Sequence, residues 1–284
     1  MKSTLRLLGI MAVAVTFLFA CASAPEESEP VSTTSVPEKT LESVPSEPVV
    51  VWSMTQERVL YPDGTIDKTI EYVLDDQGRV LQSLERNSRN EVVYDRRYTY
   101  EKNRLSTMEF FDSEGLKSTT TYKILANEQE KETVLDANGV LLSTVEKQFE
   151  NGLLLKSTAF DGEGIPQLSS VYTYDESKLI AVDYVLPDGF VEARFVRQWE
   201  QEQMVSEQTI LPDESIESER QYQYENSVLV GESFYANGSL SNSVRFERDE
   251  AGNIIREIRS NHRGQDYEVI EREWARFEIW EDSK

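Results

Sequence analysis

The chain has 284 residues, of which 52 are acidic and 29 are basic, so its formal net charge at pH 7 is −23. A surface this acidic repels nucleic acid and anionic lipid headgroups, which argues against both as electrostatic partners. A Ser-His-Asp or Cys-His site would need the single histidine, His262, which lies in a polar predicted turn.

The first 20 residues have the pattern of a cleaved export signal. Lys2 and Arg6 form a positively charged start, and the apolar run from Leu7 to Phe19 is too short to span a bilayer. Leu18-Phe19-Ala20-Cys21 then resembles the lipobox of bacterial lipoproteins. The resemblance implies cleavage before Cys21 and lipidation of that residue with fatty acyl chains, two or more of which make membrane anchoring stable. An ordinary signal peptide, in which Cys21 has no role, is the alternative.

Residues 21–49 have the composition of an extended tether. They hold five of the nine prolines, mixed with serine, threonine and glutamate, and contain no aromatic residue. Such a segment buries too little apolar surface to offset the entropy of ordering it. At about 3.1 Å per residue, we expect it to hold the domain several nanometres from the lipid surface.

Residues 50–284 carry a repeat of about 25 residues. Tyr224 is preceded at this step by Trp199, Tyr174 and Phe149. Turn residues recur every 11 to 14 residues, near positions 64, 78, 90, 103, 115, 127, 139, 152, 164, 177, 189, 202, 214, 227, 238, 252 and 264. Each interval leaves a strand of about 8 or 9 residues, too short for parallel crossovers. The spacing therefore predicts an antiparallel meander of hairpins.

Apolar and aromatic residues alternate with charged ones inside the predicted strands. Arg220, Tyr222 and Tyr224 share one parity, whereas Glu219 and Gln221 take the other. Antiparallel sheets allow one such face to be packed and the other wet. The sequence thus predicts an all-β domain of about 16 or 17 strands, forming a long twisted or rolled sheet with the tyrosine-rich face inward.

The end of the chain, about residues 265–284, is predicted to be a C-terminal cap. Repeat arrays need an atypical end piece to cover the last apolar face. The cap contains Trp274 and Trp280, two of the four tryptophans, and a tryptophan-rich binding patch is the alternative.

The aromatic positions resemble the YD repeats of RHS-type proteins. Tyr172-Thr173-Tyr174-Asp175 and Tyr222-Gln223-Tyr224-Glu225 carry the resemblance, which covers roughly residues 61–264. Phe234-Tyr235-Ala236-Asn237-Gly238 is instead similar to MORN-like antitoxin repeats. Both resemblances imply repeated hairpins, and neither implies a particular activity.

Candidate binding residues are the aromatic side chains Tyr174, Trp199, Tyr224, Trp274 and Trp280. Aromatic columns stack on carbohydrates, but cross-strand aromatics more often stabilise a sheet. Acidic turns such as Asp75-Asp76 lack the spacing of known Ca²⁺ loops, so no metal and no cofactor is expected.

Together these patterns predict a non-catalytic cell-envelope lipoprotein. It would be anchored through Cys21, with the outer membrane or cell surface favoured, and would act as a binding or scaffold module for protein or glycan. The alternative is a cell-wall-directed carboxylate enzyme such as a glycosidase, because 52 acids make some carboxylate pair inevitable.

Overall fold

The computed structural model of the chain describes residues 48–126 and 128–280. Cys21, the predicted export signal and all but the end of the predicted tether lie outside these residues. The described part contains no helix and consists of eighteen strands joined by short turns. The strands are β1 (Val49–Leu60), β2 (Ile66–Leu74), β3 (Val80–Asn87), β4 (Val92–Glu101), β5 (Arg104–Asp112), β6 (Gly115–Leu125), β7 (Gln129–Asp136), β8 (Leu141–Glu150), β9 (Leu153–Asp161), β10 (Pro166–Asp175), β11 (Lys178–Val185), β12 (Val191–Glu200), β13 (Gln203–Ile210), β14 (Ile216–Glu225), β15 (Val228–Ala236), β16 (Ser239–Arg248), β17 (Ile254–Asn261) and β18 (Asp266–Ile279).

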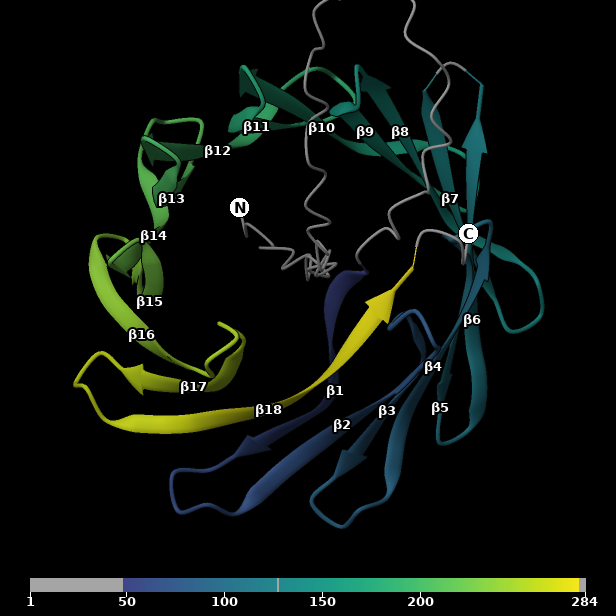
Figure 1. Ribbon diagram of the computed structural model, residues 1–284. Helices are drawn as coiled ribbons and strands as arrows, with labels where there is room; N and C mark the ends of the chain where they lie inside the picture. Colours follow the sequence, from purple (N-terminus) through teal and green to yellow (C-terminus); the bar gives the residue numbers. More distant parts are fainter. Residues whose placement is uncertain (1–47, 127, 281–284) are drawn as a thin grey trace, which may run out of the picture. The chain divides into compact units, whose positions relative to one another are not determined.

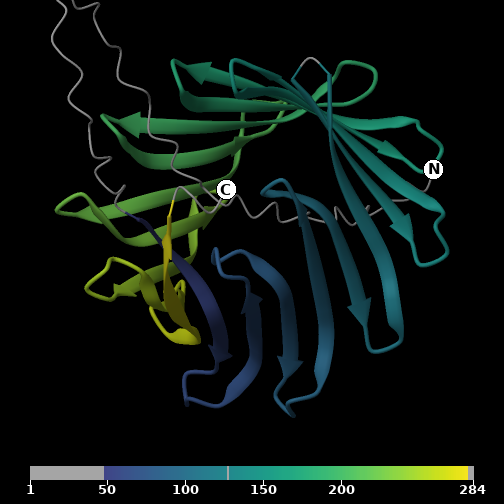
Figure 2. The ribbon, with the colours of Figure 1, turned by 45° about the vertical axis from the view of Figure 1, so that its right-hand side comes forward.

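All eighteen strands belong to one antiparallel sheet in which each strand pairs with its neighbours in sequence. The first and last strands also pair, with Val59 opposite Ile270, so the sheet closes into a barrel. Figures 1 and 2 show the strands following one another around this ring. The all-β antiparallel meander is therefore confirmed.

The predicted long twisted or rolled sheet is wrong, because the sheet is closed. The predicted count of 16 or 17 strands is also wrong: the 17 predicted turns separate 18 strands. Closure depends on hydrogen bonds between β1 and β18, which are separated by more than 200 residues, and a local repeat carries no information about such a pairing.

The turns explain why the chain reverses where it does. At the β7–β8 turn, Asp136 N–H donates to the Val140 carbonyl (2.8 Å) and Gly139 N–H donates to the Asp136 carbonyl (3.0 Å). The Asp136 carboxylate accepts the N–H groups of Asn138 (2.8 Å) and Val140 (2.7 Å). These bonds hold the pKa of Asp136 below its ordinary value. Gly139 adopts φ +81°, which favours glycine.

Turn aspartates of this kind therefore fix the backbone. Three further turn aspartates accept backbone N–H groups in the same way: Asp75, Asp161 and Asp249. The first of them belongs to the acidic turn Asp75-Asp76 that the sequence analysis considered as a Ca²⁺ loop. Among the described residues, no group of three or more acidic, histidine or cysteine side chains is arranged to hold a metal ion.

The two faces of the sheet differ in composition and exposure. In β12, Ala193, Phe195, Arg197 and Trp199 are half-buried, whereas the alternating residues at 192, 194, 198 and 200 are exposed. Side chains on the concave side of a closed sheet converge and bury one another. The tyrosine-rich face is therefore the inner wall of the barrel.

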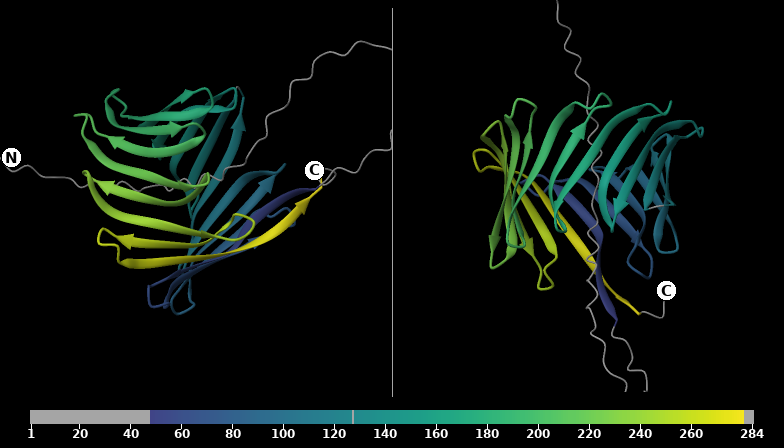
Figure 3. Two further views of the ribbon diagram at one scale, coloured as in Figure 1. Left: turned by 60° about the vertical axis from the view of Figure 1, so that its left-hand side comes forward. Right: turned by 90° about the horizontal axis from the view of Figure 1, so that it is seen from above.

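The barrel has two rims. We call the end where β1 begins and β18 ends the near rim, and the opposite end the far rim. Residues 49–54 of β1 pair with residues 274–279 of β18 beyond the last ladder positions of β2 and β17. Figure 3 shows this two-stranded extension projecting past the neighbouring strands.

Candidate functional site

A repeated hydrogen bond links neighbouring hairpins at the near rim. In each case a side chain at the end of an even-numbered strand donates to a backbone carbonyl near the start of the preceding strand. We call this the bridging hydrogen bond. The donor–acceptor pairs are Tyr100–Val80 (3.0 Å), Tyr174–Leu154 (3.0 Å), Trp199–Leu179 (3.0 Å), Tyr224–Met204 (3.0 Å), Arg248–Leu229 (3.2 Å) and Trp274–Ile254 (3.0 Å).

The bridging bond forms because the ladders between hairpins end early at this rim. The last ladder pair between β9 and β10 is Lys156 with Val171, so the Leu154 carbonyl lies beyond it. An unpaired, partly buried carbonyl is costly, and the Tyr174 hydroxyl supplies its donor. The tyrosine ring meanwhile lies half-buried on the inner wall.

Four of the five predicted binding residues occupy this column. The polar atoms of Tyr174, Trp199, Tyr224 and Trp274 all donate to backbone carbonyls. Trp280 lies apart from them, beyond the end of β18, and is 46% exposed. Their role in ligand binding stays a prediction, and lipidated Cys21 lies outside the described residues.

In β2, β6 and β8 the position equivalent to the bridging donor is taken by a side chain that cannot donate a hydrogen bond: Leu74, Ile124 and Phe149. At Phe149 none is needed, because the β7–β8 ladder continues to Gln129 opposite Gln148 and the Phe149 N–H donates to the Glu128 carbonyl (2.9 Å).

The junction between β5 and β6 is different. Its ladder ends at Thr107 opposite Thr121, and Ile124 cannot donate to the Leu105 carbonyl. Within the described ranges, no other side chain donates to that carbonyl either. We call this unbridged junction the seam.

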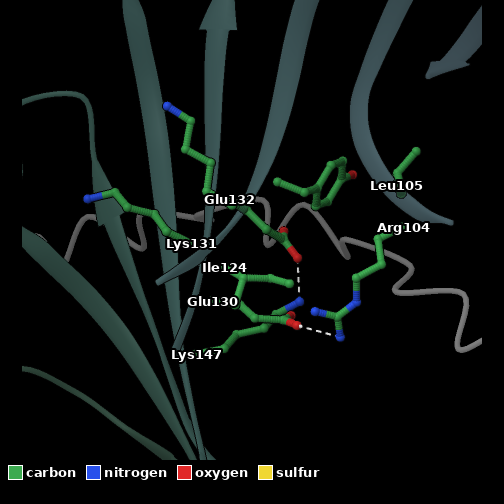
Figure 4. Close-up of a pocket in the computed structure, with 9 residues that line it drawn as sticks. Arg104, Leu105, Ile124, Glu130, Lys131, Glu132 and Lys147 are labelled. Atoms are coloured by element: carbon green, nitrogen blue, oxygen red, sulfur yellow. Dashed lines mark hydrogen bonds and ion pairs between the residues drawn. The ribbon is translucent and has the colours of Figure 1, made fainter. Parts of the chain in front are cut away.

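A pocket of about 360 Å³ lies at the seam, within the size range of small-molecule sites. It is lined by Arg104, Leu105, Tyr122, Lys123, Ile124, Glu130, Lys131, Glu132 and Lys147. Figure 4 shows Glu130, Glu132, Arg104 and Lys147 gathered on one side of the strands, with Lys131 directed away from them.

Five of the six charged side chains that line the seam pocket are held in ion pairs, including Lys131, which pairs with Glu146 outside the pocket, and Lys123 is the sixth. The Lys147 ammonium donates to Glu132, and the Arg104 guanidinium lies 3.6 Å from the Glu130 carboxylate. Burial, followed by the charge of Glu132 and the proximity of Tyr98, raises the pKa of Tyr122 to about 12, so its hydroxyl stays protonated. The pocket therefore offers an aromatic ring, two apolar side chains and hydrogen-bonding groups that are mostly held in ion pairs.

The sequence interpretation missed all of these pocket residues. A signal was present, since one 25-residue step from either Tyr100 or Phe149 falls on Ile124-Leu125, where the aromatic column is interrupted. The early end of the β5–β6 ladder, which turns that interruption into a pocket, could not be predicted from the sequence.

A second feature of the inner wall is a row of glutamates on β13, β15 and β17. Glu207 accepts from Arg197 (2.9 Å) and from the Tyr222 hydroxyl (2.6 Å). Glu257 accepts from Arg259 (2.7 Å) and Arg272 (2.8 Å).

Glu232 lies between them, with the Arg220 guanidinium 3.6 Å from its carboxylate. Burial, together with the charges of Glu257 and Glu207, raises the pKa of Glu232 despite Arg220. By contrast, although burial opposes the shift, the hydrogen bonds from Arg272 and Arg259 lower the pKa of Glu257.

No helix in the described part of the chain is long and apolar enough to cross a membrane. No family model matches the chain, and no curated protein matches it.

Among solved structures, the chain is similar to a porin-like protein from Bacteroides uniformis ATCC 8492. The identity is 12% and the TM-score 0.45, over 78% of this chain and 96% of that one. It is also similar to a DUF1329 family protein from Desulfovibrio piger ATCC 29098, with 10% identity and a TM-score of 0.24, over 81% and 86% of the two chains. These TM-scores are too low for either likeness to support an argument about function, and the resemblances to YD and MORN-like repeats stay predictions.

Proposed function

We propose that the protein is a non-catalytic cell-envelope lipoprotein that binds a neutral segment of an envelope glycan in the seam pocket. The observation that supports this most is the pocket at the β5–β6 junction, where Ile124 takes the place of a donor and no side chain of the described residues donates to the Leu105 carbonyl. A sugar ring can stack on Tyr122 and present hydroxyl groups to that carbonyl and to the ion pairs. Because five of the six charged side chains in the lining are already held in ion pairs, an uncharged polyhydroxylated ligand fits them better than an ion.

Ile124→Tyr tests this site directly. The new hydroxyl should donate to the Leu105 carbonyl as Tyr100 does to Val80, and its ring should fill the pocket. Isothermal titration of the purified lipoprotein with an N-acetylglucosamine tetramer and a glucose tetramer should show binding of at least one. Ile124→Tyr should weaken it by about tenfold or more.

Phe149→Tyr is the matched control, because its neighbouring ladder leaves no open carbonyl and it does not line the pocket. This variant should bind like the unchanged protein. Equal binding by Ile124→Tyr, or loss of binding in Phe149→Tyr, would contradict the assignment of the seam pocket.

The anchor is a separate part of the proposal. Without residues 1–20, which carry Lys2 and Arg6 and no acid, the chain is hydrophilic and has 27 basic and 52 acidic residues, a formal charge of −25, so attachment to a membrane should depend on lipid at Cys21. Cys21→Ser should yield an uncleaved precursor or a released exported protein, seen by mass spectrometry of the N-terminal peptide and by membrane fractionation. A substituted protein that is cleaved after Ala20 yet stays on membranes after a salt wash would rule out a single anchor.

A carboxylate enzyme acting on the cell wall is the second candidate, and Glu232 is the observation that favours it. A buried carboxyl whose pKa is raised, lying in a row with two other glutamates, has the character of a general acid. Purified protein would then digest peptidoglycan, and Glu232→Gln would abolish the digestion while leaving thermal stability intact. We expect no digestion by either protein.

A further inference from the structure

The far rim carries a ring of apolar side chains that the glycan proposal does not use. It contains residues at or beside the start of β2, β4, β8, β10, β12, β14 and β16, each between 38% and 59% exposed: Ile66, Val92, Val140, Ile165, Phe190, Val191, Ile216 and Leu240. Single apolar residues scattered over a protein surface are normal, whereas apolar residues grouped around a hollow mark an interaction site.

The ring is hollowed between the β11–β12 and β13–β14 turns. A second pocket of about 360 Å³ lies there, and its lining is Phe190, Val191, Ala193, Arg194, Ile210, Leu211, Pro212 and Glu214. We call it the rim hollow. It is mainly apolar, in contrast to the seam pocket.

Both turns that form the rim hollow are closed by backbone hydrogen bonds. Leu186 N–H donates to the Phe190 carbonyl (2.8 Å), and Leu211 N–H donates to the Ser215 carbonyl (2.9 Å). Pro212 further restricts the second turn. The hollow is thus formed before any partner arrives, which reduces the entropy lost on binding.

Acidic side chains surround the rim hollow. Asp188, Glu192, Asp213, Glu214 and Glu217 lie on the two turns and on the strands that follow them. The one cation in the lining, Arg194, is already held by both oxygens of Asp183 at 2.6 and 2.9 Å. The surroundings of the hollow therefore carry an uncompensated negative charge.

This charge decides which occupant fits. A second copy would bring its own acidic rim against this one, and an anionic lipid surface would be repelled. A sugar would leave most of the apolar lining without a partner. We propose that the rim hollow is a docking site for a protein segment that inserts a large apolar side chain flanked by lysine or arginine. This proposal is independent of the seam pocket and would stand if no glycan bound there.

The experiment uses the purified lipoprotein and three labelled twelve-residue peptides. One alternates leucine with lysine, the second replaces leucine with serine, and the third replaces lysine with glutamate. Fluorescence anisotropy should show binding of the leucine–lysine peptide alone. Phe190→Ser should weaken that binding by about tenfold or more, because it removes an apolar wall of the hollow. Glu214→Gln should weaken it less and should reduce its salt dependence.

Val228→Ser is the matched control, since Val228 is 45% exposed but lies at the near rim. It should bind the leucine–lysine peptide unchanged. Equal binding of the serine–lysine peptide would overturn the proposal, because it would show attraction by charge alone. Unchanged affinity in Phe190→Ser would do the same. The proposal would also be overturned if the protein bound none of the peptides but associated with itself or adhered to phosphatidylcholine vesicles, and Phe190→Ser removed that association or adhesion.

Discussion

At the scale of single residues, the bridging side chains combine two tasks. Tyr174, Trp199 and Tyr224 present an apolar ring to the inner wall and one donor to a carbonyl that the ladder leaves open. The 25-residue aromatic column could be read from the sequence. The acceptors could not, because they depend on where each ladder ends, and Arg248 fills the same role without being aromatic.

Tyr224→Phe isolates the donor from the ring. The variant keeps the packing but leaves the Met204 carbonyl without its partner, so we expect a loss of about 1–2 kcal/mol in the free energy of unfolding. Denaturant titration measures it. Tyr267→Phe is the control, since Tyr267 is 43% exposed, and it should change stability by less than about 0.5 kcal/mol. Equal losses in the two variants would show that the bridging bond contributes nothing.

At the scale of elements, the unit of construction is the hairpin. Turn chemistry and period-two alternation are local properties, and they were sufficient to place all 17 turns. The extension of β1 and β18 was not predictable in the same way. A β-carbon on Gly78, in the β2–β3 turn, would lie 2.6 Å from the Ser53 hydroxyl and 2.9 Å from the Phe277 ring, so this turn packs closely against the extension.

A pair of glycine substitutions measures that packing. Gly78 and Gly139 both have positive φ, +75° and +81°, but the space around Gly139 is empty. Gly139→Ala should cost about 1 kcal/mol through backbone strain alone. Gly78→Ala should cost about 1 kcal/mol more and should accelerate amide hydrogen exchange in residues 49–54. Identical effects on stability and exchange would mean that the turn does not hold the extension.

At the scale of the whole molecule, closure is the feature that the sequence did not reveal. Arg272 on β18 donates to Glu57 on β1 (2.9 Å) and to Glu257 on β17 (2.8 Å), so one side chain joins three strands where the ring closes. These partners come from opposite ends of the domain, and no repeat or motif pairs them in advance. The seam pocket is equally hidden, because it depends on which ladder ends early.

Arg272→Met should show how much closure depends on this contact. Its side chain is only 15% exposed, so removing it takes the partner from the buried Glu57 carboxylate and leaves Glu257 with Arg259 alone, and we expect a loss of about 3 kcal/mol. Hydrogen exchange should accelerate in β1 and β18 first. Arg58→Met removes the outer-face pairs with Glu271 and Glu273, which are more exposed, and should cost less than about 1 kcal/mol. A larger loss in Arg58→Met would reverse this ranking.

Next-neighbour pairing also means that the circumference of the barrel is set by a count of hairpins. Each repeat of about 25 residues supplies two adjacent strands and both of their turns, and each contacts only the repeats beside it. Duplicating or deleting one repeat by unequal recombination would therefore change the perimeter by about 10 Å and leave every local contact type intact. Such an event would also widen or narrow the interior in discrete steps, so the diameter of this barrel can evolve without a new fold.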